Sequence, residues 1–195
     1  MSTRGSYRAP FDSDHALKLR IPFCHGLICL NKTFYHIYMI TLYMPLGLVE
    51  GHKLLEIGLG SGYSAVVARE IVGEKGLVVC VEIDPSVFAA GKRFVQSSGY
   101  DDIVLILGDG ALGHPEKAPY DRICITAACT EVPPPLIEQL KPGGKLILPL
   151  LEGNIQKIVL FEKNDTGIVK NIVRDAGANI RYVPMRGKCG TENAG

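Results

Sequence analysis

The fold is decided by the stretch LLEIGLGSGYSA, residues 54–65. The apolar run from Lys53 to Ile57 predicts a strand, and the segment from Ser64 to Val72 predicts a helix directly after it. Every second position of the turn between them is glycine, which permits a tight turn and lets a ligand approach the backbone closely. The helix that follows offers free N–H groups at its start. This stretch therefore predicts a strand–turn–helix unit that binds a nucleoside.

Short apolar strands alternate with amphipathic segments from Lys53 onward, which is typical of a parallel sheet wrapped by helices. The further predicted strands are Gly76 to Ile83, Ile103 to Leu107, Arg122 to Thr126 and Lys145 to Leu150. The further predicted helices are Ser86 to Ser97, with Pro85 in its first turn, and Pro135 to Leu140, closed by the turn Lys141 to Gly144.

The pattern changes after the fifth strand. Lys157 to Lys163 and a segment near Ile180 to Val183 follow with no long helical pattern between them. The end of the sheet should therefore be a hairpin. We expect an α/β fold with an open, mostly parallel sheet, helices on both faces and an antiparallel strand near the C-terminus.

Length and composition predict a single domain over residues 1–195. The chain has 195 residues, of which 47% are hydrophobic, enough to bury a substantial core. We divide it into an N-terminal helical segment, residues 1–50, and a core, residues 51–195. The apolar run from Phe34 to Val49 contains a histidine and a proline, and we interpret it as a buried helix rather than a membrane span.

Charge and cysteine usage exclude several classes. Lys plus Arg is 21 against 20 for Asp plus Glu, so nothing draws the whole chain to nucleic acid or to a membrane. None of the six cysteines forms a CxxC pair, so we expect no metal site and interpret them as core residues of a protein in the reducing cytosol. The first twenty residues contain no apolar run typical of a secretory signal. We expect a soluble, cytoplasmic protein.

The spacing of the glycines discriminates between nucleoside ligands. In the dinucleotide fingerprint G-x-G-x-x-G that begins at Gly58, the third glycine would fall at position 63, which is Tyr63. The chain has G-x-G-x-G instead, with glycine at Gly60 and Gly62. This pattern favours a methionine-sulfonium nucleoside, which has no pyrophosphate, over NAD.

Two acidic residues end neighbouring predicted strands. Glu82 ends the second strand about twenty residues after the loop, where a carboxylate can accept hydrogen bonds from both ribose hydroxyls. Asp84 precedes Pro85 and is predicted to cap the next helix. Asp109, between two glycines at the end of the third strand, can reach an adenine amino group, although an Asp-Gly turn is the alternative. Three strand ends then point to one crevice.

At these residues the chain resembles the protein-L-isoaspartate (D-aspartate) O-methyltransferase family. The resemblance runs from about Thr33 to about Lys188. It is carried by LLEIGLGSGYSA (54–65), VVCVEID (78–84), ILGDGALG (106–113), APYDRICITAACTEVPPPLIEQLKPGGKLILPL (118–150) and RYVPMRGK (181–188).

The resemblance implies a Rossmann-like class I methyltransferase fold and S-adenosylmethionine as cofactor. It implies methyl transfer to the free carboxylate of L-isoaspartyl residues in damaged proteins, which begins their repair. The residues it places at the cofactor are Glu56, Gly58, Gly60, Gly62, Glu82, Asp109 and Gly110, with Tyr63 and Ile83 beside them.

The family also carries a substrate-side segment, T-I-S-x-P-H-M, ahead of the glycine loop. This chain has Asn31-Lys-Thr-Phe-Tyr-His-Ile37, which makes Thr33 and His36 the candidate catalytic residues, but the proline is absent. Arg20 to Leu30 also departs from the family. A relative with a changed substrate is therefore an alternative.

The chemistry leaves three functions open. A carboxylate acceptor is ionised near neutral pH and needs no general base, so positioning should supply most of the rate. An amine or phenol acceptor would need a base, for which His36 is the candidate. The alternatives to isoaspartate are another acceptor, such as a small molecule, a peptide or RNA, and a relative that binds S-adenosylmethionine without catalysis. The oligomeric state is not predicted.

Overall fold

The computed structural model describes residues 42–175 and 181–188 of the chain. The strands are β1 (Lys53–Ile57), β2 (Leu77–Glu82), β3 (Val104–Leu107), β4 (Tyr120–Ile125), β5 (Leu140–Glu152), β6 (Ile155–Asn164) and β7 (Gly167–Asp175). The helices are α3 (Tyr63–Val72), α4 (Pro85–Ser97) and α5 (Pro134–Glu138), with the 3-10 turns η1 (Gly110–Leu112) and η2 (Pro115–Lys117). Residues 42–46 are also helical.

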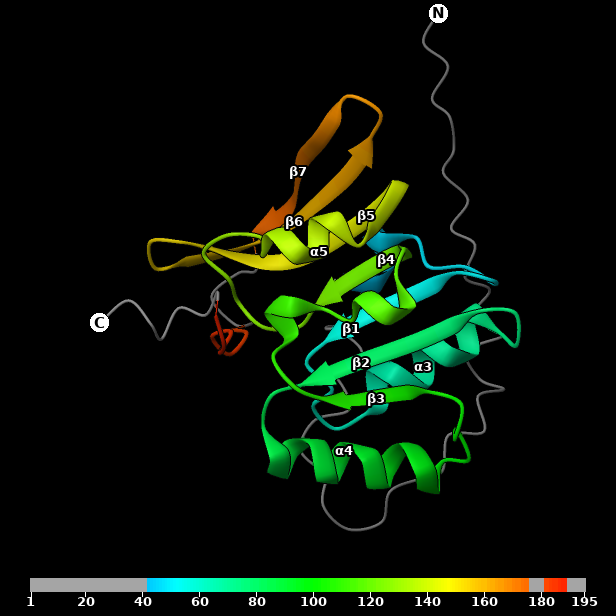
Figure 1. Cartoon of the computed structure of the whole chain (residues 1–195). Helices are drawn as coiled ribbons and strands as arrows, with labels where there is room; N and C mark the ends of the chain where they lie inside the picture. The colour runs from blue at the N-terminus through cyan, green and yellow to red at the C-terminus, as the bar shows by residue number, and fades with distance from the viewer. Residues whose placement is uncertain (1–41, 176–180, 189–195) are drawn as a thin grey trace, which may run out of the picture.

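The strands form a single seven-stranded sheet in the order β3-β2-β1-β4-β5-β6-β7. Figure 1 shows them in this order, from β3 at the bottom to β7 at the top. The pairs from β3 to β5 are parallel, whereas β6 runs antiparallel to both β5 and β7. This confirms the predicted α/β class, with its mostly parallel sheet and an antiparallel strand near the C-terminus.

Two details of the C-terminal prediction were wrong. The last strand is Gly167–Asp175 and not the segment near 180–183, of which residues 181–183 form no strand. The predicted turn from Lys141 to Gly144 lies inside β5, where the register on β4 moves from Tyr120 opposite Leu140 to Arg122 opposite Lys145. The turn residues are therefore accommodated as a bulge in a longer strand.

The core lies on both faces of the sheet because successive side chains of a strand point to opposite sides. Leu54 of β1 packs on one face with α3 and with Val95 of α4. Leu55 packs on the other face with Leu136 of α5. Helices therefore cover both faces, as predicted. Among the described residues, none belongs to a helix of the length and apolar character needed to span a membrane.

The parallel arrangement places the carboxyl ends of β1 to β4 at one edge of the sheet. Backbone hydrogen bonds continue past the strands there: Gly58 N–H donates to Val81 (2.8 Å), Gly108 to Glu82 (2.8 Å) and Thr126 to Ile57 (2.9 Å). These bonds bring the loops after four strands together. Open α/β sheets bind ligands at such an edge.

Candidate functional site

The loop between β1 and α3 has a conformation that requires glycine. Gly58, Gly60 and Gly62 all have positive φ angles, at 97°, 54° and 82°. Gly62 is buried against α4, since a Cβ built on it would lie 2.8 Å from the carbonyl oxygen of Gly91. Gly60 is exposed, and nothing lies within 4 Å of the position that its Cβ would take. The crest of the loop is therefore open to a ligand, and Tyr63 begins α3 beside it.

Glu82 at the end of β2 is linked to this loop. Its side chain is buried, with the residue 8% exposed, and its two carboxylate oxygens accept the N–H groups of Gly60 (3.2 Å) and Asp84 (3.0 Å). A carboxylate offers about four acceptor positions, so two stay open for ligand hydroxyls. Ile83, half-buried, continues the chain directly after Glu82.

Asp84 caps α4, as predicted. Its carboxylate accepts from the backbone of Ser86 (2.9 Å) and Val87 (3.2 Å) and forms an ion pair with Arg186 (3.0 Å). The hydrogen bonds from Ser86 and Arg186 hold the pKa of Asp84 well below its usual range. The bond to Arg186 joins α4 to a segment more than one hundred positions later in the sequence.

Asp109 follows β3 at the same edge. One carboxylate oxygen caps η1 by accepting from Ala111 N–H (2.9 Å), and the other accepts from Lys188 N–H (2.9 Å). Gly110 lies so close to the end of β1 that a Cβ there would collide with the side chain of Ile57. The loop after β3 therefore reaches the end of β1, although the contact of Asp109 with adenine stays a prediction.

Glu56 lies on β1 behind the loop and is fully buried. Its carboxylate accepts from the Tyr43 hydroxyl (3.0 Å) and the Cys80 thiol (3.4 Å), and Cys80 and Cys124 flank it on the neighbouring strands. Burial raises the pKa of Glu56 to about 7, against hydrogen bonds from Ser64, Tyr43 and Cys80 that lower it. The same burial, together with Glu56, raises the pKa values of both thiols.

The structure adds two groups that the sequence argument missed. Thr126, directly after β4, bonds through its hydroxyl to the carbonyls of Ile57 (2.9 Å) and Gly58 (3.1 Å). Residues 183–188 return to the strand ends, where Met185 N–H donates to Ala128 (2.8 Å). The strand-end rule that selected Glu82 and Asp109 could have selected Thr126, but no local pattern shows that a later segment returns.

Two further predictions concern the catalytic residues and a metal site. Thr33 and His36 lie outside the described residues, so their roles stay predictions. Within residues 42–175 and 181–188, no three His, Cys, Asp or Glu side chains are grouped as metal ligands.

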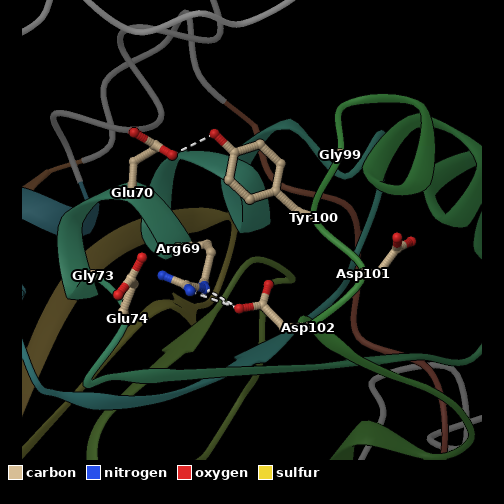
Figure 2. A pocket seen from close by; sticks show the side chains of 8 residues that line it. All are labelled: Arg69, Glu70, Gly73, Glu74, Gly99, Tyr100, Asp101 and Asp102. Atoms are coloured by element: carbon tan, nitrogen blue, oxygen red, sulfur yellow. Dashed lines mark hydrogen bonds and ion pairs between the residues drawn. The ribbon is translucent and has the colours of Figure 1, made fainter.

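The surface hollow in Figure 2 lies away from the predicted cofactor residues. It is formed by the C-terminal end of α3 and the segment before β3, and Arg69 pairs there with Asp102 (2.6 Å) while Tyr100 donates to Glu70. The glycine loop precedes the opposite end of α3, one helix length or about 15 Å away. None of the predicted cofactor residues lines this hollow.

Comparison with known proteins agrees with this geometry. The chain is 41% identical over 145 residues to protein-L-isoaspartate O-methyltransferase 2 of Archaeoglobus fulgidus, covering 74% of this chain and 64% of that protein. It is 42% identical over 164 residues to the protein-L-isoaspartate O-methyltransferase of Methanococcus aeolicus, covering 84% of this chain and 74% of that one. The chain thus spans less than two thirds of the Archaeoglobus relative.

A solved protein-L-isoaspartate O-methyltransferase has the same fold. It superposes with a TM-score of 0.71 at 36% identity over 80% of this chain and 48% of the other. Residues 24–190 match the family described as protein-L-isoaspartate(D-aspartate) O-methyltransferase, a range that contains every predicted site residue. The chain, with its open glycine loop and the carboxylates of Glu82 and Asp109 at two strand ends, therefore belongs to the protein-L-isoaspartate(D-aspartate) O-methyltransferase family.

Proposed function

We propose that this protein transfers the methyl group of S-adenosylmethionine to the free carboxylate of L-isoaspartyl residues in damaged proteins and peptides. The observation that carries the proposal is the meeting of an open glycine loop with Glu82 and Asp109 at one edge of the sheet, in a chain of this family. The substrate is the one named for the relatives in Archaeoglobus and Methanococcus.

The residues present fit the cofactor. The space beside Gly60 leaves room for a ligand against the backbone, and a Cβ would project into that space. The free acceptor positions of Glu82 suit two ribose hydroxyls, and those of Asp109 suit an adenine amino group. Two carboxylates also complement the positive charge of a sulfonium compound, which gives the site a reason to prefer S-adenosylmethionine to an anionic dinucleotide.

The work left to the chain is alignment. When bound, S-adenosylmethionine supplies a methyl group that is already activated for transfer. The acceptor carboxylate is ionised near neutral pH, so the protein need not remove a proton from it. Alignment alone can lower a barrier by on the order of 7–11 kcal/mol. We assign orientation of the acceptor to Thr33 and His36, and retention of the nucleoside to the loop, Glu82 and Asp109.

We place the reaction in the cytoplasm. Two of the cysteines, Cys80 and Cys124, are free thiols buried in the core. Free thiols persist in a reducing compartment. Fractionation of the source cells with an antibody to this chain tests the location, and recovery in a secreted fraction would contradict it.

Transfer of tritiated methyl from S-adenosylmethionine to an isoaspartyl peptide tests the proposed function. We expect incorporation into that peptide and none into the aspartyl peptide of the same sequence. Incorporation into total RNA instead would show a methyltransferase with another acceptor. Binding of S-adenosylhomocysteine without incorporation into any of these substrates would show a binding protein and remove the proposed reaction.

A further inference from the structure

Thr126 holds the glycine loop where the loop leaves β1. Its hydroxyl lies 2.9 Å from the Ile57 carbonyl oxygen and 3.1 Å from that of Gly58, and its backbone N–H donates to Ile57 at 2.9 Å. A hydroxyl donates one hydrogen, so the two carbonyls share it. Three contacts from one residue therefore fix the direction of the first peptide units of the loop.

The same contact explains why position 58 is glycine. A Cβ on Gly58 would collide with the side-chain oxygen of Thr126, and the φ angle of +97° is one that other residues rarely adopt. The hydroxyl occupies the space that a side chain at 58 would need. Close approach of Thr126 and the conformation of Gly58 therefore depend on each other.

The loop is held from its other side by β2. Glu82 accepts the Gly60 N–H, and Leu59 between the two anchored glycines is itself only 1% exposed. The loop thus lies between a donor that follows β4 and an acceptor that ends β2. Glu82 is also the predicted partner of the ribose, whereas the hydroxyl of Thr126 is already directed at the loop carbonyls, so its effect on a ligand passes through the loop.

We propose that Thr126 is the positioning residue of the glycine loop, whose hydroxyl keeps the loop in the conformation that receives the cofactor. The inference rests on the proposed function for the identity of that cofactor. The conformation of the free loop is independent of that identity. Two measurements, one with ligand and one without, therefore separate the two ideas.

The ligand measurement uses three variants. Thr126→Val keeps the shape and removes the donor, and Thr126→Ser keeps the donor. Thr166→Val makes the same change in the exposed turn before β7, where the hydroxyl donates to Asn164 of the same turn. We expect Thr126→Val to raise the dissociation constant of S-adenosylhomocysteine about three- to tenfold, the effect of one lost hydrogen bond. The KM for the cofactor should rise with it, with little change in kcat. Thr126→Ser and Thr166→Val should bind within twofold of wild type.

The ligand-free measurement is amide hydrogen exchange across residues 57–62. We expect faster exchange in Thr126→Val and wild-type exchange in Thr126→Ser and Thr166→Val. If Thr126→Val does not unfold cooperatively, Thr126→Ala replaces it, because it introduces no new methyl group beside the carbonyls. Unchanged exchange and affinity in a folded variant without the hydroxyl, or failure of serine to restore them, would overturn the proposal. If the wild type does not bind S-adenosylhomocysteine, the proposed cofactor is wrong, and exchange alone decides the role of Thr126.

Discussion

Two buried carboxyl groups on neighbouring strands have different surroundings. Glu82 receives backbone N–H groups from the loop and from its own strand end, whereas Glu56 receives a phenol and a thiol in a closed part of the core. The backbone donors at the edge of the sheet occupy two acceptor positions of Glu82, and the other positions can bind a ligand. The enclosed environment of Glu56 instead makes it a proton-binding group inside the fold.

Loss of Glu82 should weaken cofactor binding. Glu82→Ala removes a charged acceptor of hydroxyl hydrogen bonds and the acceptor of Gly60 N–H, so we expect a loss of about 1–3 kcal/mol in the binding free energy of S-adenosylhomocysteine. Calorimetric titration measures this loss. Glu74→Gln, an exposed change at the far end of α3, is the control and should leave affinity unchanged. Equal affinity of Glu82→Ala and wild type would remove Glu82 from the site.

Glu56 should make stability depend on pH. Burial raises its pKa from the usual 4.5 to about 7, so the folded protein keeps this proton at pH values where the unfolded chain has lost it. The contribution of Glu56 to the free energy of unfolding therefore falls as pH rises from 4.5 to 7. The fall is on the order of 3 kcal/mol.

Glu56→Gln should lack this fall because an amide does not titrate. Urea unfolding of both proteins at pH 5 and pH 8 measures the effect. Subtracting the free energy of unfolding of wild type from that of the variant at each pH removes the contribution of the other carboxylates. We expect the variant to gain stability relative to wild type between the two pH values. A difference independent of pH would show that Glu56 does not keep its proton in the folded state.

At the scale of elements, α3 and α4 meet the loop through glycines. A Cβ on Gly91 of α4 would lie 2.7 Å from the Gly60 carbonyl oxygen and 2.8 Å from the Leu59 side chain. The two helices can therefore approach only because neither Gly62 nor Gly91 has a side chain. Helix packing and the shape of the ligand loop are set by the same contact.

Gly91→Ala should destabilise the protein although alanine favours helix. The propensity gain is up to about 1 kcal/mol, but forcing a methyl group into this contact typically costs about 1–3 kcal/mol and displaces the loop. Urea unfolding and calorimetric titration should show lower stability and weaker binding of S-adenosylhomocysteine together. Gln96→Ala, exposed on the same helix, supplies the comparison and should show neither change. A Gly91→Ala protein as stable as wild type would mean that the contact yields easily.

At the scale of the whole molecule, the end of the described chain returns to the carboxyl ends of the parallel strands. Met185 is 2% exposed in the core beside Cys129, Arg186 pairs with Asp84, and Lys188 donates to Asp109. The segment from 183 to 188 thus bridges the ends of β2, β3 and β4. The segment thus has an apolar anchor, the buried Met185 side chain, and an ionic anchor, the ion pair of Arg186. The two should differ greatly in how much they stabilise it.

Met185→Ala should cost about 2–5 kcal/mol of stability, the usual effect of truncating a buried side chain. Arg186→Ala should cost at most about 1 kcal/mol, because its side chain is 47% exposed and a solvated ion pair contributes little. Urea unfolding of both variants decides between the anchors. An arginine loss larger than the methionine loss would show that the ion pair, and not burial, holds the segment.

Much of the fold follows from local pattern. Three local signals each involve only a few neighbouring residues: alternate glycines after an apolar strand, a capping Asp84 before Pro85, and apolar runs between helical segments. The structure has the corresponding loop, helix start and strands at these positions. The prediction misses the last strand because residues 167–173 of this edge strand are all exposed, so that part of the strand has no buried face to impose a pattern. The bulge in β5 is not predicted because proline and glycine in a sequence indicate a turn, whereas here pairing with the neighbouring strands keeps them within β5.

The sequence by itself determined the fold class, the family and the positions of Glu82 and Asp109 at the ends of β2 and β3, because periodicity and motif spacing are properties of neighbouring positions. Only the tertiary structure decided that Thr126 anchors Gly58, that Gly91 makes room for the loop and that Met185 returns to the end of β4. These contacts join residues 31 to more than 60 positions apart. The strength of such a contact depends on how closely the folded chain brings the two residues together. The residues next to each of them in the sequence do not reveal that distance.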